Sequence, residues 1–170
     1  METELISAFK ESALYRIDES TRMIQIAMGK ISEEQVWLRP NAKSNSIGNI
    51  ILHLCGNIGQ YAISSLGRLP DTRKRDAEFE VSEGVTKEEL LQKLVKIVEK
   101  AKEIIQNLPA DEFIRMRQVQ AYEFTGIGVI THVVEHYSYH TGQIAFWVKL
   151  LTEQDLGFYD GVELTKKNKE

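Results

Sequence analysis

Three prolines divide the 170-residue chain into four long segments, each with a helical pattern of apolar residues. Pro40, Pro70 and Pro109 all lie in polar stretches, where a residue with a fixed φ and no backbone N–H interrupts regular structure. Between these stretches, apolar side chains recur every three to four residues, which is the spacing of one face of an α-helix. The chain is therefore expected to be all-α, with four long helices.

Capping patterns mark where several of these helices begin. The four predicted helices span about residues 4–29, 46–66, 86–107 and 125–151. Ser46 is a suitable N-cap for the second helix, because its side chain can accept a hydrogen bond from the first turn. Thr86 and Glu89 form a capping box at the third, in which each side chain satisfies the other's backbone N–H. A second box, Ser32 with Gln35, predicts one short helical turn in the first connection.

The connections between the helices are longer than a tight antiparallel turn requires. They cover about residues 30–45, 68–85 and 108–124. Fully extended, the 18 residues of the middle connection reach about 60 Å, twice the roughly 30 Å length of a 20-residue helix. This connection can carry the chain back to the end from which the second helix started. We therefore expect the second and third helices to run parallel.

The composition is that of one globular domain. Hydrophobic residues make up 42% of the chain and charged residues 27%, enough for a core and for a hydrated surface. A chain of 170 residues is also shorter than those that usually divide into domains. We expect a helical bundle domain over residues 1–165, followed by a charged C-terminal tail, 166–170.

The charge balance and the lone cysteine exclude several classes of protein. The formal net charge is −4, without the basic excess that attracts nucleic acid or anionic lipid, and the run Arg73-Lys74-Arg75 is interpreted as solvated surface. Cys55 has no partner for a disulfide within the chain. The first residues do not resemble a signal peptide, and no apolar stretch approaches the roughly 18 residues that span a bilayer. We expect a cytoplasmic, unprocessed protein with no nucleic-acid or membrane partner.

Three of the four histidines share one face of the fourth predicted helix. His132, His136 and His140 are four residues apart, so each lies about 40° further around the helix than the last. Two imidazoles at this spacing can chelate one metal ion, but a complete site needs a third ligand from elsewhere. His53, on the second helix, is the other histidine of the sequence.

Helical rise ranks the three candidates by their height relative to His53. If the second and fourth helices are antiparallel, His53 lies about 10 Å from their shared end. His140, His136 and His132 lie about 16, 22 and 28 Å from that end. The nearest pair is therefore His136 with His140.

Polar side chains surround the candidate histidines on both helices. Those expected to support a metal ion or to contact substrate are Asn49, Asn57, Gln60, His132, Tyr139 and Gln143. Amide and hydroxyl groups can hydrogen-bond the second nitrogen of a metal-bound imidazole, as carboxylates do. Cys55 and Ser138 point away from these helix faces, which weakens a nucleophilic Ser–His pair. The segment HYSYH lacks the glutamate that follows the first histidine in zinc proteases.

Spacing alone leaves other interpretations open. A row of His, Asn and Gln on one helix face is also typical of a solvated surface, and a histidine inside a bundle is often hydrogen-bonded without a metal. Trp37 and Trp147 are compatible either with ordinary core or with a homodimer interface.

Two segments make the chain resemble the DinB/YfiT-like superfamily, most closely a DinB-like subfamily. They are NSIGNIILHLCGN at 45–57 and HVVEHYSYHTGQI at 132–144. The resemblance implies an all-α four-helix bundle in up-down-down-up order, with a divalent metal ion held by His53, His136 and His140. Imidazole ligands suit zinc or nickel, which are the expected ions, and also iron.

The resemblance also implies an activity. Characterised relatives include bacterial thiol-dependent S-transferases and a mycothiol-dependent isomerase. We therefore expect a metal-dependent enzyme that transfers a low-molecular-weight thiol to an electrophilic small molecule. Three neutral ligands leave the charge of the ion largely uncompensated, which favours deprotonation of a bound thiol or water. The alternatives are a hydrolase that uses bound water and a noncatalytic helical binding or dimerisation module, and a homodimer is the expected assembly.

Overall fold

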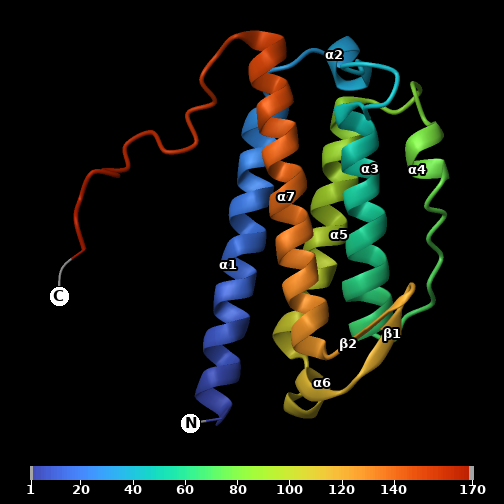
Figure 1. The fold of residues 1–170 in the computed structure, drawn as a ribbon, viewed down its shortest axis with the longest axis vertical. Helices are drawn as coiled ribbons and strands as arrows, with labels where there is room; N and C mark the ends of the chain where they lie inside the picture. The colour runs from blue at the N-terminus through green and yellow to red at the C-terminus, as the bar shows by residue number, and fades with distance from the viewer. Residues whose placement is uncertain (1, 169–170) are drawn as a thin grey trace.

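Four long helices lie side by side in the computed structural model, which describes residues 2–168 and side chains from residue 4 onward (Figure 1). In chain order the elements are α1 (Glu2–Met28), α2 (Glu33–Trp37), α3 (Ile47–Ile58), the π-helical segment η1 (Gly59–Leu66), α4 (Ala77–Glu80), α5 (Lys87–Asn107), α6 (Ala110–Ile114), β1 (Arg117–Val119), β2 (Tyr122–Phe124) and α7 (Gly126–Thr152). The four predicted helices correspond to α1, α3 with η1, α5 and α7. Their ends lie within two residues of the predicted ones.

The long helices run up, down, down and up. In Figure 1, α1 and α7 rise while α3 and α5 descend. α1 packs along α7 and α3 along α5, so both of these pairs are parallel, whereas α3 meets α7 antiparallel. The middle connection runs back beside α3 to the top of the bundle, as its length predicts. The all-α fold class and its up-down-down-up order are confirmed.

Reciprocal side-chain caps fix the starts of three helices. At α3, the Ser46 hydroxyl accepts a hydrogen bond from the Asn49 backbone N–H, and the Asn49 side chain accepts one from the Ser46 N–H. The boxes predicted at Thr86 and Ser32 are present at α5 and α2. These contacts satisfy N–H groups that have no partner within the first helical turn.

The connections hold more regular structure than the sequence predicts. α4 lies in the middle connection, and α6 with the antiparallel hairpin β1–β2 lies in the last. These elements are three to five residues long, too short for a periodic pattern to be recognised. Gln120, at the hairpin turn, has a φ of 55°, and its side chain accepts a hydrogen bond from the Tyr61 hydroxyl at 3.0 Å. The second helix also changes to π-helical hydrogen bonding at Gly59, which no sequence pattern indicated.

α3 is enclosed on nearly every side. Eleven of its 12 residues are buried, because α4, α5 and α7 all pack against it. Ile51 and Leu54 of α3 belong to the hydrophobic core together with Leu94 of α5. A polar side chain on this helix is therefore removed from bulk water, and His53 is only 8% exposed.

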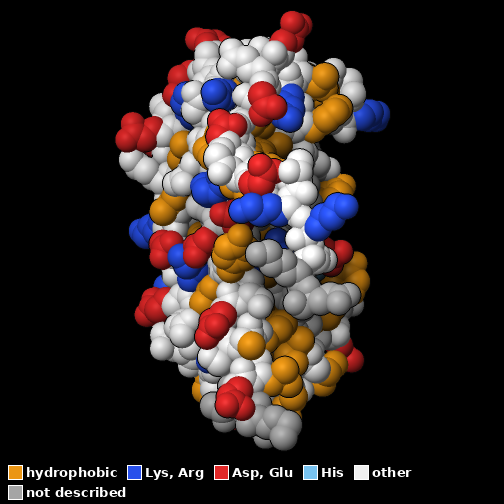
Figure 2. Space-filling view, turned by 90° about the vertical axis from the view of Figure 1, so that its left-hand side faces the viewer, with side chains coloured by type: hydrophobic (Ala, Val, Ile, Leu, Met, Phe, Trp, Pro, Cys, Tyr) orange, Lys and Arg blue, Asp and Glu red, His pale blue; other side chains and the backbone are white. Residues whose placement is uncertain are grey.

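The surface carries charges of both signs. On the face that Figure 2 shows, acidic and basic side chains are interspersed, as on an ordinary solvated surface. None of the described helices combines the length and the apolar character needed to cross a membrane.

Candidate metal centre

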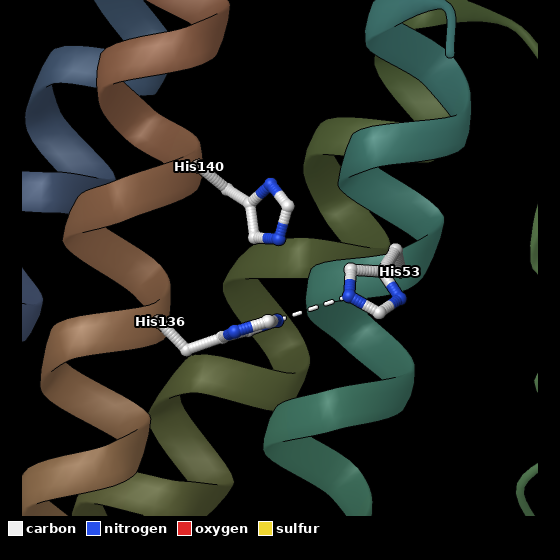
Figure 3. A group of neighbouring side chains, drawn as sticks. All are labelled: His53, His136 and His140. Carbon is white, nitrogen blue, oxygen red and sulfur yellow. Dashed lines mark hydrogen bonds between the residues drawn. The ribbon is translucent and has the colours of Figure 1, made fainter. Parts of the chain in front are cut away.

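Three histidines from two helices converge between α3 and α7 (Figure 3). His53 comes from α3, and His136 and His140 come from α7. One ring nitrogen of each lies within 4.8 Å of those of the other two. The Nε2 atoms of His53 and His136 are 3.0 Å apart. Two nitrogens that bind one ion at about 2.0–2.1 Å lie about 2.9–3.4 Å apart, so this pair has the separation that a shared ion requires.

The second ring nitrogen of His53 is held by a carboxylate. Nδ1 of His53 lies 2.9 Å from Oε2 of Glu78, and Nη2 of Arg73 lies 2.9 Å from the same oxygen. An ionised carboxylate only accepts hydrogen bonds, so Nδ1 carries a hydrogen and Nε2 is the nitrogen that can bind a metal ion. Nη2 of Arg73 and Nδ1 of His53 lie 3.2 Å apart because both donate a hydrogen bond to Oε2 of Glu78. Glu78 thus selects the tautomer of His53 that presents Nε2 to a metal ion.

Glu78 is itself held in place from two directions. Arg73 donates to both carboxylate oxygens, from Nε at 2.7 Å and from Nη2 at 2.9 Å. Burial raises the pKa of Glu78, but hydrogen bonds from Arg73 and His53 outweigh burial and lower that pKa below its usual value, so the group is ionised at neutral pH. Asn49 anchors the backbone at this point by donating to the carbonyls of Glu78 and Val81.

Gln143 orients the third histidine. Its Oε1 lies 2.7 Å from Nδ1 of His140 and accepts the ring hydrogen, which leaves Nε2 of His140 facing the other two rings (Figure 3). Burial and the neighbouring histidines lower the pKa of His136 to about 3, and burial lowers that of His140 to about 4. Both rings are therefore neutral at pH 7, the form in which imidazole binds a metal ion.

His132 lies next to this cluster but outside it. Nδ2 of Asn57 lies 3.2 Å from Nε2 of His132 and donates to it. The His132 ring stacks on Tyr61, with 4.0 Å between centroids, and on His136, with 5.3 Å. Because its Nε2 is already engaged, His132 supports the ring of His136 by packing. The Oδ1 atom of Asn57 is buried without a hydrogen-bond partner among the described residues.

The remaining predicted site residues, Tyr139, Gln60 and Asn49, hydrogen-bond none of the three clustered histidines within residues 4–168. Tyr139 is 60% exposed, and its ring meets that of the third histidine at 4.9 Å between centroids. Gln60 accepts a hydrogen bond from Arg73, and Asn49 holds the backbone at Glu78. Neither Gln60 nor Asn49 hydrogen-bonds a histidine within residues 4–168, so both act on the cluster through Arg73 and Glu78.

Glu78 was not among the residues predicted for the site, and the prediction that Arg73 is solvated was wrong. The predicted solvated run holds for Lys74 and Arg75, which are exposed, but the Arg73 side chain is only 5% exposed and pairs with Glu78. The buried carboxylate draws the guanidinium inward, because an unpaired charge there would be costly. The middle connection holds five acidic residues, and nothing in their spacing distinguishes Glu78 from the others.

Because Gly56 has no side chain, the Glu78 carboxylate can pack directly against the backbone of α3. A Cβ at residue 56 would overlap that carboxylate and lie 2.9 Å from Arg73 Nε, so Gly56→Ala should push Glu78 off its histidine. Loss of such an outer partner weakens metal binding 10–100-fold, so we expect about a tenfold higher Kd for zinc in a calorimetric titration. Gly59→Ala is the matched control, since a Cβ there makes one ordinary contact at 3.9 Å. Equal affinities of the two variants would contradict this role of Gly56.

The arrangement of helices has solved counterparts. A DinB-like protein of Bacillus subtilis, YjoA, is 16% identical and has a TM-score of 0.65, with 85% of this chain and 94% of that one covered. A DinB-like protein of Bacillus cereus is 12% identical, with a TM-score of 0.67 and coverages of 85% and 91%. The chain therefore has a DinB-like fold, which is the fold that the resemblance in its sequence implied.

The family follows from a match to a family model. Residues 5–159 match the family described as "Protein of unknown function (DUF1572)", and the chain belongs to this family. No curated protein matches the chain in sequence. The three-histidine cluster and the groups around it are therefore the features that bear on its function.

Proposed function

We propose that this chain is a divalent-metal-dependent enzyme in which His53, His136 and His140 bind the ion and a small thiol activated there attacks an electrophile. Three imidazoles converge at this point, and this convergence supports the proposal most directly. In two of them, His53 and His140, Nδ1 is hydrogen-bonded to a protein acceptor. A ring whose Nδ1 is hydrogen-bonded to the protein has its Nε2 free to bind a cation. A histidine that serves only packing needs no such convergence.

The proposed zinc or nickel ion and the protein contribute different parts of the chemistry. When bound, a divalent ion lowers the pKa of a thiol or water that shares it, so a nucleophile is available at neutral pH. Glu78 and Gln143 hold two of the rings in the ligating orientation. Both oxygens of the Glu78 carboxylate accept hydrogen bonds from Arg73. Glu78 therefore supports His53 and is not one of the proposed metal ligands.

The thiol in this proposal comes from a cosubstrate. Cys55 is the one cysteine of the chain and is only 3% exposed. Burial raises the pKa of its thiol to about 12, which makes it a poor source of thiolate. A low-molecular-weight thiol is therefore the proposed nucleophile and a small electrophile the proposed acceptor. The cytoplasmic location and the homodimer stay predictions.

Turnover of a model electrophile tests this proposal. The chain, loaded with zinc or nickel, is mixed with 1-chloro-2,4-dinitrobenzene and with cysteine, glutathione or a cysteinyl-sugar thiol in turn. The thiol sulfur forms a carbon–sulfur bond as the carbon–chlorine bond breaks, and chloride and a proton leave. We expect turnover that requires both ion and thiol and that a chelator abolishes. Metal-dependent formation of 2,4-dinitrophenol and chloride without thiol would favour the hydrolase instead, and no turnover with any pair of ion and thiol would contradict the transferase.

A further inference from the structure

A cavity lies beside the metal centre, at the end of the bundle where α3 begins and α7 ends. Its volume is about 440 Å³, within the range of small-molecule sites. The connection before α3 contributes one wall and the helices α3 and α7 the others. The lining residues that matter here are Lys43, Ile50, Gln143, Phe146, Trp147 and Leu150.

The walls suit a molecule with an apolar body and an anionic group. Phe146 and Leu150 are 67% and 55% exposed, so these side chains contribute surface to the cavity and little to the core. Trp147 and Ile50 extend the apolar wall. Lys43 is the charged residue of the lining, which includes no acidic side chain among the described residues. A carboxylate or sulfonate on the bound molecule would pair with Lys43.

Gln143 joins the cavity to the metal centre. Its Oε1 accepts the hydrogen of His140 Nδ1, and its side chain also lines the cavity. Within residues 4–168 its amide nitrogen donates to no other group, so both hydrogens can meet a bound molecule. By helical rise, Phe146 and Leu150 lie about 9 and 15 Å beyond His140 along α7. A molecule of that length with its reactive end at the histidines would place its body in the cavity.

We infer that this cavity binds the electrophilic acceptor, a small molecule with an aromatic or alkyl body and an anionic group that pairs with Lys43. The role of acceptor rests on the proposed function, whereas binding rests on the cavity itself. The two therefore need separate measurements.

Binding is tested with 8-anilino-1-naphthalenesulfonate, an aromatic anion that fluoresces on leaving water, titrated into the zinc-loaded chain. We expect its Kd to rise roughly tenfold in Phe146→Ser, because an apolar contact is lost, and about threefold in Lys43→Glu. Leu164→Ser is the matched control, since Leu164 is also 67% exposed but lies in the C-terminal segment. An unchanged Kd in the first two variants, or an equal rise in the control, would overturn the inference.

Placement beside the metal centre is tested with Co²⁺ in place of zinc. Proton signals of the bound probe should broaden, because paramagnetic relaxation falls steeply with distance from the ion. A probe that binds without broadening would overturn the placement. His136→Ala separates the two proposals: loss of cobalt with the probe still bound supports both, whereas retained cobalt overturns the proposed ligand set and leaves the cavity standing.

Discussion

Changing His136 to alanine is expected to reduce bound zinc from about one ion per chain to nearly none and to raise the Kd more than about 100-fold. Nε2 of His136 lies 3.0 Å from Nε2 of His53, so these two nitrogens have the separation that one shared ion requires. The two imidazoles left in the variant fall short of the three protein ligands usual in catalytic zinc sites. Elemental analysis of protein purified without a metal-affinity tag gives the stoichiometry, and calorimetry gives the Kd.

His132→Ala is the matched control for this experiment. His132 lies one turn away on the same helix, and its ring stacks on that of His136 at 5.3 Å. Its Nε2 accepts from Asn57, so we expect the zinc content to stay near that of the unaltered chain, with a Kd within about tenfold. Zinc retained in His136→Ala, or lost equally in both variants, would show that the assigned ligand is wrong.

The grouping of the histidines was predictable because an α-helix is rigid. Residues four apart share a face, and the rise per residue is constant, so heights can be compared between two antiparallel helices. That comparison selected His136 and His140 as neighbours of His53, and the structure brings these three together. The comparison worked because the caps and the long connections, both visible in the sequence, fix where the helices begin and how they run.

Glu78 was not predictable in this way, because α4 is only four residues long and is placed by tertiary contacts. One of these contacts comes from Asn49, whose Oδ1 caps α3 while its Nδ2 holds the carbonyls of Glu78 and Val81. The capping role is visible in the sequence, but the second role is not. Gly56 was the available signal, since a glycine inside a helical pattern often marks a close approach by another group.

Glu78→Ala is expected to weaken zinc binding about 10–100-fold although every proposed ligand remains. The carboxylate keeps the hydrogen of His53 on Nδ1, leaves Nε2 as the ligating atom and makes the ring more basic. Without it, His53 loses the contact that selects its tautomer. Arg73, whose side chain is 5% exposed, would also keep a positive charge near the site without its carboxylate partner. Both changes disfavour a bound cation, and calorimetric titration of the metal-free variant with zinc measures the result.

Two further variants separate a role in the metal centre from a role in folding. Glu78→Gln keeps an acceptor for Nδ1 but removes the charge, so its Kd should lie within about tenfold of that of the unaltered chain. Glu80→Ala removes an exposed carboxylate from the same short helix and should leave the Kd unchanged. The melting temperature of each metal-free variant is measured alongside. If Glu78 served folding alone, both of its variants would melt earlier while binding zinc with an unchanged Kd, and that outcome would remove Glu78 from the metal centre.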